Sequence, residues 1–394
     1  MANRRSAVGA MMMAALLAGA SACSGNSEAG TNGEGGTKAP SAQVRITPAN
    51  GAGSVRPDQG VAVAASGGKL EQVTVAQNGK PVPGDFTPDH TQWKTKWALK
   101  PGASYTVNAT AKNAKGKSAT ATSKFQTQKA TQSFKITDVT PQPGETVGVG
   151  MPIIVTFDKP IANKANVEKA LEVKSDKGDT GVWHWMSPQQ VVFRTQKFWG
   201  AHQNVTLTAH MSGVRGLKGV YGKTDTTRAF KIGASNVTVA NAKTHYMKVN
   251  HDGVVKKFPI STGVGSTTEY TTTSGLHITQ EKSESVTMES PNRKEGDPGY
   301  YKEVVNLAVR ITNKGEYVHQ SVGEYDALGH RNASHGCVRT SPTGARYFYK
   351  ISQRGDIVNV TGTSRKLSNE VDSNGWVFWA LSWEKWVKGS ALQH

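Results

Sequence analysis

The sequence predicts a mainly β protein with two tandem immunoglobulin-like β-sandwiches, a third β-rich domain and a tryptophan-rich C-terminal tail. Three observations predict this fold class. Short apolar runs broken by turn residues recur at ~8–12-residue spacing, which is typical of β-sandwiches. The same order of runs occurs in residues 43–128 and again in residues 133–233. Residues 235–363 are also strand-rich but differ in character, with a hairpin turn at Asp252–Gly253.

The first 23 residues have the features of an export signal. Arg4 and Arg5 precede an apolar run from residue 7 to residue 20, and small residues lead to Cys23. The apolar run is too short to span a bilayer as a helix. Small residues before Cys23 resemble a bacterial lipobox, although Ala20 stands where Leu is commoner. This resemblance implies that Cys23 becomes the lipidated first residue, and a simple cleaved signal is the alternative.

Residues 24–42 are rich in Gly, Ser and Asn, and they predict a flexible linker. A chain of this kind has a root-mean-square reach of only ~25 Å. The folded modules that follow must therefore supply most of the distance from a membrane.

The two predicted sandwiches repeat one scheme. Residues 44–46, 61–63, 73–75 and 104–107 are strand-like in the first, which ends on residues 124–127. Residues 135–137 and 153–157 begin the second, which ends on residues 228–232. Trp183 and Trp185 lie two apart on one strand face, which predicts core packing, with sugar stacking as the alternative. Neither module contains a cluster of catalytic residue types.

Residues 235–363 predict a domain of strands with one helix. The expected strands cover residues 275–279, 304–311, 315–319 and 356–360, and residues 345–351 form the expected helix. The tail, residues 364–394, has tryptophans at a spacing of 3, 4 and 3 on one face of a short helix: Trp376, Trp379, Trp383 and Trp386. We expect this stripe to dock onto the third domain or the second sandwich, with insertion into a membrane surface as the alternative.

The 394-residue chain is strongly basic, with a net charge of +18, a pI near 9.7 and a mean hydropathy of −0.48. Such a charge attracts polyanions. The lysines are scattered, and no basic run interleaved with aromatics and no nucleic-acid-binding motif is found. An anionic cell wall or membrane surface is therefore the expected partner, and nucleic acid is not.

Cys337 is the candidate nucleophile. If Cys23 carries lipid, Cys337 is the only free thiol of the mature chain, and it has no disulfide partner. His319 ends a predicted strand, and Cys337 begins a turn that approaches a helix, so the two can meet. A nearby His lowers a thiol pKa and can act as the general base. Arg339 adds a positive charge that also lowers the thiol pKa, or it binds a carboxylate. The amide of Gly336 can help to form an oxyanion hole.

The full pattern is more specific than a Cys–His pair. His319, a gap of 14 residues, and the string Ser334-His335-Gly336-Cys337-Val338-Arg339 closely resemble the signature of L,D-transpeptidases with a YkuD-type catalytic domain. Residues 258–263 resemble the strand before the active-site face of that family, and residues 272–275 resemble its Thr-Pro-x-Gly turn. The resemblance covers residues 235–363, and the whole layout is similar to the multidomain members.

This resemblance implies an acyl transfer on peptidoglycan that needs no cofactor and no metal. Cys337 would attack the bond before the terminal D-Ala of a tetrapeptide stem and form a thioester. His319, oriented by the carbonyl of Gln320, would serve as base and then as acid. The acyl group would pass to the side-chain amine of a diaminopimelate on another stem, giving a 3→3 cross-link. The family also implies that carbapenems acylate Cys337.

The resemblance also implies substrate-binding residues around the nucleophile. A Tyr on a lid-like loop assists in the family, and Tyr300 and Tyr301 are both candidates here. Arg339 departs from the Asn of many relatives. The expected substrate-binding set is Met288, Tyr300, Tyr301, Ser334, His335 and Arg339.

Three alternatives stay open at this stage. An L,D-carboxypeptidase would give the same acyl group to water. A sortase-like enzyme also uses Cys, His and Arg, but its Arg lies further beyond the Cys than Arg339 does. A wall-binding or metal-binding protein would use His319, His335 and Cys337 as zinc ligands, although no second Cys supports a tetrahedral site.

Overall fold

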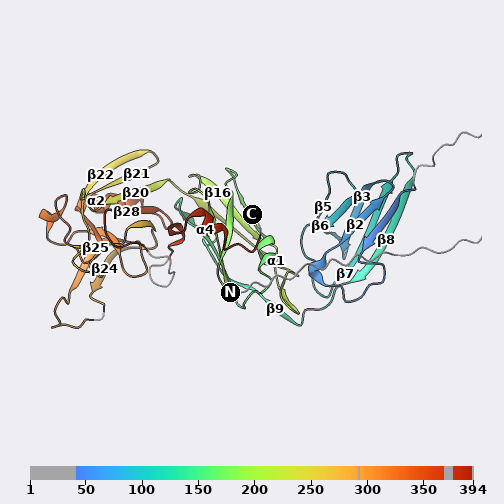
Figure 1. Ribbon diagram of the computed structural model, residues 1–394, viewed down its shortest axis with the longest axis horizontal. Helices are drawn as coiled ribbons and strands as arrows, with labels where there is room; N and C mark the ends of the chain where they lie inside the picture. The colour runs from blue at the N-terminus through green and yellow to red at the C-terminus, as the bar shows by residue number, and fades with distance from the viewer. Residues whose placement is uncertain (1–40, 292, 368–375, 393–394) are drawn as a thin grey trace, which may run out of the picture. The chain divides into compact units, whose positions relative to one another are not determined.

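The computed structural model describes residues 41–291, 293–367 and 376–392 (Figure 1). The predicted signal, Cys23 and nearly all of the predicted linker lie outside the described residues. No helix in the described part of the chain combines the length and the apolar character that a membrane crossing requires.

The first sandwich packs two four-stranded antiparallel sheets, ordered β1-β2-β6-β5 and β4-β3-β7-β8. Inward-facing residues alternate along β7, where Val107, Ala109 and Ala111 are buried beside Phe125 of β8 and Trp93 of β6. The elements are β1 (Gln43–Thr47), η1 (Pro57–Gln59), β2 (Ala62–Ser66), β3 (Lys69–Gln77), β4 (Lys80–Pro81), β5 (Gly84–Phe86), β6 (Gln92–Thr95), β7 (Ser104–Lys112) and β8 (Ser118–Gln126).

The second sandwich has sheets ordered β10-β12-β15-β14 and β11-β19-β16-β13, with a small third sheet, β17-β18-β9. Trp183 and Trp185 are both buried in its core, which confirms the core-packing prediction. The elements are β9 (Gln132–Phe134), β10 (Ile136–Thr140), β11 (Thr146–Val147), β12 (Ile153–Phe157), α1 (Lys164–Lys169), β13 (Leu171–Ser175), β14 (Gly181–Ser187), β15 (Gln190–Thr195), β16 (Gln203–Ala209), β17 (Arg215–Leu217), β18 (Val220–Gly222) and β19 (Thr226–Ile232).

The third domain is built on a nine-stranded sheet in the order β23-β28-β20-β21-β22-β27-β26-β25-β24. Asp252 and Gly253 have φ values of 48° and 90°, as the predicted hairpin turn between β21 and β22 requires. The elements are β20 (Asn236–Asn241), β21 (Tyr246–His251), β22 (Val254–Ser261), β23 (Gly275–Ile278), β24 (Lys282–Glu289), β25 (Lys302–Arg310), β26 (Tyr317–Gln320), η2 (Tyr325–Ala327), β27 (Val338–Thr340), α2 (Pro342–Ile351) and β28 (Ile357–Thr361).

Helix α2 begins with a capped turn and lies against β25 and β26. The hydroxyl of Ser341 accepts a hydrogen bond from the N–H of Gly344 at 3.2 Å, and Pro342 occupies the first turn. Phe348 of α2 is buried against Val318 of β26 and Val338 of β27. The helix therefore holds in place the short strand that follows the candidate nucleophile.

The C-terminal tail differs from the single helix that the tryptophan spacing predicts. It forms a 3₁₀ turn, η3 (Phe378–Ala380), and a separate short helix, α4 (Trp383–Val387). Leu381 is extended between them, and Ser382 caps α4 through the N–H of Lys385. The prediction of one continuous helix is therefore wrong, because this cap starts a new helix inside the stripe.

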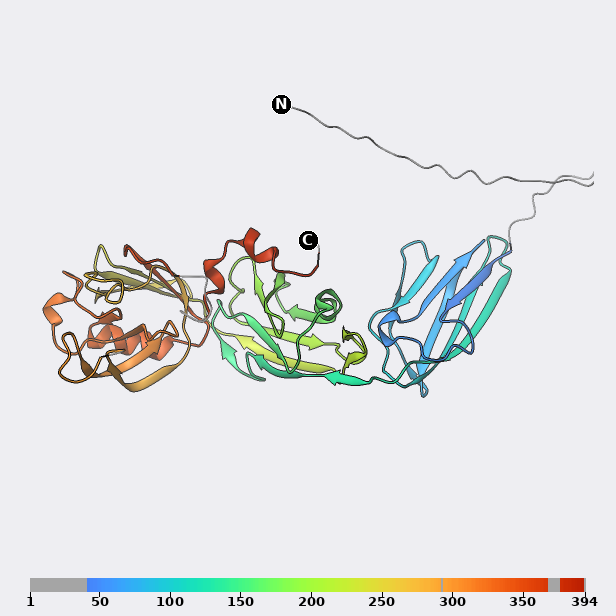
Figure 2. The ribbon, with the colours of Figure 1, turned by 60° about the horizontal axis from the view of Figure 1, so that its bottom comes forward.

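The tail docks on the second sandwich, and its apolar cluster also includes residues of the third domain (Figure 2). The side chain of Trp386 is fully buried, and its Nε1 donates a hydrogen bond to the carbonyl of Val182 at 2.8 Å. Ile278 and Ile357 of the nine-stranded domain belong to the same cluster as Trp386 and Phe378.

A buried arginine lies at the centre of this contact, which we call the tail dock: Arg194 with Trp379, Trp383 and Trp386. The guanidinium carbon of Arg194 is 4.7 Å from the ring centre of Trp379, 4.7 Å from that of Trp386 and 5.4 Å from that of Trp383. Its Nη2 donates to the carbonyl of Leu381 at 2.8 Å. Burial lowers the pKa of Arg194 to about 10, so the side chain stays charged.

Candidate active site

The predicted base lies on β26, and the predicted nucleophile lies just before the parallel strand beside it, β27. In the register of β26 with β27, His319 stands opposite Arg339, and Cys337 immediately precedes β27. The predicted turn toward a helix is therefore wrong in detail, since a three-residue strand separates Cys337 from α2. Both side chains line one pocket of about 180 Å³.

The thiol of Cys337 is held against the sheet. Its Sγ lies 3.6 Å from the carbonyl oxygen of Gly315 and 3.8 Å from Sδ of Met288. Burial raises the pKa of Cys337 to about 12, and the negative charges of Glu316 and Glu303 act in the same direction. The N–H of Tyr317 and the charge of Arg339 oppose this increase without reversing it. The thiol is therefore protonated near neutral pH.

His319 is 2% exposed, and its Nδ1 lies 2.7 Å from the carbonyl oxygen of Gln320, as the family resemblance implied. Burial lowers the pKa of His319 to about 4, and the charge of Arg339 lowers it further. No hydrogen bond joins His319 to Cys337 in the described residues. The predicted lowering of the thiol pKa is therefore wrong for this conformation, because desolvation of the sulfur outweighs the nearby positive charge.

The turn before the nucleophile is tied down by hydroxyl groups. The N–H of Gly336 donates to Oγ of Ser334 at 3.2 Å, and Ser334 Oγ donates to the carbonyl of Cys337 at 2.6 Å. Gly336 has a φ of 135°, which favours glycine, although a Cβ would meet nothing closer than 3.6 Å. The amide N–H of Gly336 is thus hydrogen-bonded to Ser334, and its role in an oxyanion hole stays a prediction.

The two candidate tyrosines lie in different environments. Tyr301 lines the pocket and stacks on His335 with ring centres 4.1 Å apart and planes at 6°. Tyr300 does not line it, and its hydroxyl donates to Glu289 at 2.9 Å. Burial raises the pKa of Tyr301 to about 12, so its hydroxyl keeps its proton. The geometry favours Tyr301 as the lid tyrosine, and its role toward substrate stays a prediction.

Arg339 lies in the pocket wall with only 6% of its surface exposed. Its Nη2 is 2.8 Å from Oε2 of Glu324 in an ion pair that lacks hydrogen-bond geometry, and its buried Nε has no hydrogen-bond partner in the described residues. Arg339 therefore keeps a donor that a substrate oxygen could use.

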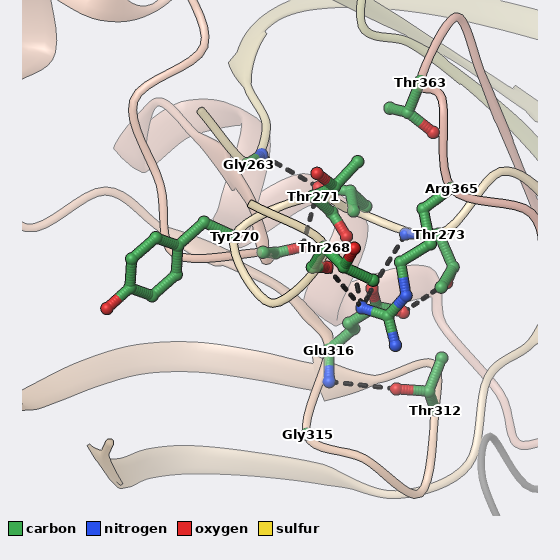
Figure 3. Close-up of polar contacts among 12 residues, drawn as sticks. Gly263, Thr268, Tyr270, Thr271, Thr273, Thr312, Gly315, Glu316, Thr363 and Arg365 are labelled. Carbon is green, nitrogen blue, oxygen red and sulfur yellow. Dashed lines mark hydrogen bonds and ion pairs between the residues drawn. The ribbon is translucent and has the colours of Figure 1, made fainter. Parts of the chain in front are cut away.

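A polar network that sequence reasoning missed lies behind the nucleophile (Figure 3). The carboxylate of Glu316 accepts hydrogen bonds from the N–H of Thr273 at 2.8 Å and from the hydroxyl of the same residue. Arg365 Nη1 lies 3.9 Å from Glu316 Oε1 and donates to the carbonyls of Thr268 and Thr271. Glu316 and Arg365 both line the pocket.

The sequence pattern contains no signal for Arg365 and one usable signal for Glu316. Arg365 follows the last strand of the domain, in a stretch that reads as the start of the tail, and Glu316 immediately precedes β26. The one usable signal for Glu316 was its position beside Gly315, three residues before His319.

Two loops contact each other beside the pocket, the loop between β22 and β23 and the loop between β24 and β25. Arg293 makes a two-pronged ion pair with Glu269, with N···O distances of 2.6 and 2.7 Å. The hydroxyl of Tyr270 donates to the carbonyl of Gly299 at 3.3 Å, and its ring meets His335 edge-on at 5.2 Å. These loops frame the entrance beside the His335–Tyr301 stack.

The zinc alternative requires at least three ligands to converge. Across residues 41–291, 293–367 and 376–392, no three His, Cys, Asp or Glu side chains come together in a group that could hold a metal ion. His319, His335 and Cys337 share the pocket without forming such a group.

Comparison with known families agrees with this fold. The family model of the L,D-transpeptidase catalytic domain matches residues 235–360, and that of a bacterial Ig domain matches residues 52–215. The molecule is thus of the class that joins Ig-like modules to a YkuD-type catalytic domain.

Curated relatives match over nearly the full chain. L,D-transpeptidase 2 of Mycobacterium tuberculosis is 33% identical, with 98% of this chain and 96% of the relative covered. L,D-transpeptidase 5 of the same organism is 32% identical, with 90% and 78% covered. The chain belongs to the L,D-transpeptidase family.

Solved structures also match. L,D-transpeptidase 3 of Mycobacterium tuberculosis, solved in complex with a faropenem-derived adduct, is 34% identical with a TM-score of 0.48. The match covers 58% of this chain and 98% of that one.

Proposed function

We propose that this chain is a peptidoglycan L,D-transpeptidase in which Cys337 is the nucleophile and His319 the general base. The observation that carries the proposal is that both line one pocket, with His319 on β26 and Cys337 immediately before β27, the parallel neighbour of β26. Family membership supports peptidoglycan stem peptides as the substrate.

Acylation starts from a neutral thiol and a neutral imidazole, because burial moves the pKa of Cys337 to about 12 and that of His319 to about 4. Cys337 Sγ turns away from the carbonyl of Gly315 and attacks the carbonyl carbon before the terminal D-Ala. Its proton passes to Nε2 of His319 as the C–S bond forms. The C–N bond to D-Ala then breaks, and the leaving amine takes that proton.

The thioester is resolved by an amine. The side-chain amine of a diaminopimelate on another stem attacks the thioester carbon, the C–S bond breaks, and the thiol recovers a proton through His319. The product is a 3→3 cross-link. Attack by water on the same thioester would make the chain an L,D-carboxypeptidase.

Intact-protein mass tests the nucleophile. A tetrapeptide donor or a carbapenem should add one acyl mass to the wild-type chain and none to Cys337→Ala. His319→Gln should slow acylation by about 10²–10⁴-fold, the usual contribution of a general base. Acylation that survives Cys337→Ala would overturn the proposal.

Muropeptide analysis then shows whether an amine or water accepts the acyl group from Cys337. Incubation with donor and acceptor stems should give a cross-linked product with loss of D-Ala. Tripeptide alone, at every acceptor concentration, would replace the transpeptidase by the carboxypeptidase.

We also propose that lipid on Cys23 anchors the chain to the outer face of the cell membrane, with the sandwiches as spacers toward the wall. The lipobox-like residues before Cys23 and the net charge of +18 support this. Labelled palmitate should be incorporated into the wild-type chain and not into Cys23→Ala. Deleting residues 43–128 should spare reactions on soluble fragments and impair reactions on intact wall, and equal performance on both would contradict the spacer role.

A further inference from the structure

The charged residues of the catalytic pocket fall into paired and unpaired groups. Glu316 is paired with Arg365 within the network of Figure 3, Glu269 with Arg293, and Arg339 with Glu324. Two further charged residues line the pocket, Glu303 and Lys314. Neither side chain has a hydrogen bond or an ion pair within the part of the chain that the structure describes. One open negative and one open positive charge therefore face the same pocket.

Glu303 is placed beside the nucleophile by the β-sheet register. It stands directly opposite Met288 in the pairing of β24 with β25, and Met288 Sδ contacts Cys337 Sγ at 3.8 Å. It also lies two residues before Val305, on the same strand face, and Val305 packs in one cluster with Cys337. Burial lowers the pKa of His335 and raises that of Cys337, and the negative charge of Glu303 opposes the first change and adds to the second, as a carboxylate close to both would.

Lys314 lines the same pocket from another element. It lies in the turn between β25 and β26, next to Gly315, whose carbonyl oxygen is 3.6 Å from Cys337 Sγ. Its side chain is exposed at the pocket wall. Opposite charges thus line the pocket of the nucleophile from β25 and from the turn that follows it.

We propose that Glu303 and Lys314 form the recognition site for the zwitterionic end of the acceptor, a carbon that carries both an ammonium and a carboxylate. This inference rests on the proposed function, in which the acceptor is the side-chain amine of diaminopimelate. That amine is attached to a carbon that also carries a carboxylate. Glu303 binds the ammonium beside the thioester, and Lys314 binds the carboxylate.

The charges fit the order of the reaction. The bound ammonium first loses one proton to the neutral imidazole of His319, which releases it to solvent. The free amine then forms the C–N bond, the C–S bond breaks, and the amine's second proton passes through His319 to the departing sulfur. The thioester and the ammonium become an amide, a thiol and one released proton. Water has no ammonium for Glu303 to hold, so this site favours transfer over hydrolysis.

The test measures how the acyl-enzyme is partitioned. The wild-type chain is acylated by a tetrapeptide donor and offered three tripeptide acceptors: one with diaminopimelate, one with diaminopimelate whose side-chain carboxylate is amidated, and one with lysine. Mass spectrometry gives the ratio of cross-linked to hydrolysed product, and the acylation rate is measured separately without acceptor.

Glu303→Gln should lower the ratio of cross-link to hydrolysis by about tenfold with every amine acceptor, about 1.4 kcal/mol. Lys314→Gln should lower it only for the acceptor with a free carboxylate, so that the amidated and free acceptors become equal. Glu284→Gln on β24 and Lys350→Gln on α2 are the matched controls, since both residues are exposed and lie outside the pocket.

Each other outcome overturns the inference. A ratio unchanged in Glu303→Gln refutes the ammonium site, and an undiminished preference for the free carboxylate in Lys314→Gln refutes the carboxylate site. Acylation and cross-linking that fall by equal factors would assign both residues to the donor instead. A chain that donors do not acylate at Cys337 fails at the proposed function, before this test begins.

Discussion

Two arginines are buried among the residues that the structure describes, and they differ in what surrounds them. Arg194 in the tail dock is 3% exposed and enclosed by three indole rings and a carbonyl. Arg339 in the catalytic pocket is 6% exposed and has one ion pair with the half-exposed Glu324. The first is enclosed by protein groups, and the second faces a pocket. In this molecule, the buried arginine that faces a pocket belongs to the candidate active site. The buried arginine that protein groups enclose belongs to a structural contact.

The largest expected effect on stability comes from removing a tryptophan that encloses Arg194 in the tail dock. Trp386→Ala removes a fully buried indole and its hydrogen bond to Val182, and should lower the free energy of unfolding by about 3–5 kcal/mol. Calorimetry measures the loss. Trp383→Ala, at a half-buried position of the same helix, is the control and should cost clearly less. Equal losses in the free energy of unfolding for the two variants would show that Trp386 contributes no more to the tail dock than Trp383 does.

The next effect tests whether shape or charge matters at Arg194. Arg194→Lys keeps the charge but loses the flat guanidinium that the indoles stack on, so we expect a loss of about 2 kcal/mol in the free energy of unfolding. Acylation of Cys337 by a carbapenem is the second readout. A lysine variant as stable as the wild type would mean that charge alone suffices in the dock.

A smaller effect on stability is expected at Arg339, the buried arginine that faces the pocket. Glu324→Gln removes the ionic partner of Arg339, and because Glu324 is half exposed the loss in stability should be only about 1 kcal/mol. The same calorimetric experiment measures it. A loss as large as that of Arg194→Lys would contradict the distinction between the two arginines.

The smallest effect concerns the charge pair behind the nucleophile. The negative charge of Glu316 raises the pKa of Cys337, so Glu316→Gln should move the pH midpoint of thiol alkylation to lower pH. Arg365→Gln leaves Glu316 less compensated and should move it to higher pH. Alkylation rates between neutral and alkaline pH measure both. Shifts in the same direction would show that the network acts through structure and not through charge.

The sequence predicted most of the fold because strand alternation and turn residues are local properties. The Asp252–Gly253 turn and the helix after β27 are set by a few neighbouring residues, and both were predicted. The tail was predicted less well, since a helix cap at Ser382 overrides the tryptophan spacing. The docking surface of the tail depends on Arg194, which is 185 or more residues away from the tryptophans that enclose it.

The candidate site was predictable in identity but not in electrostatics. Cys337 and His319 follow from cysteine counting and the string around them, and the structure brings them to one pocket. Their pKa directions depend on burial, which the local sequence does not specify. The choice between Tyr300 and Tyr301 depends on which ring stacks on His335, a contact between residues 34 positions apart in the sequence.

The network in Figure 3 bears on how such enzymes are recombined. The match to the catalytic-domain family ends at residue 360, yet Arg365 beyond it forms part of the pocket wall. A chimaera that exchanges C-terminal segments between relatives after residue 360 would therefore transplant a piece of the active site together with the tail. Grafting experiments in this family should place their junction beyond Leu367, so that the donor's tail arrives without altering the host's chemistry.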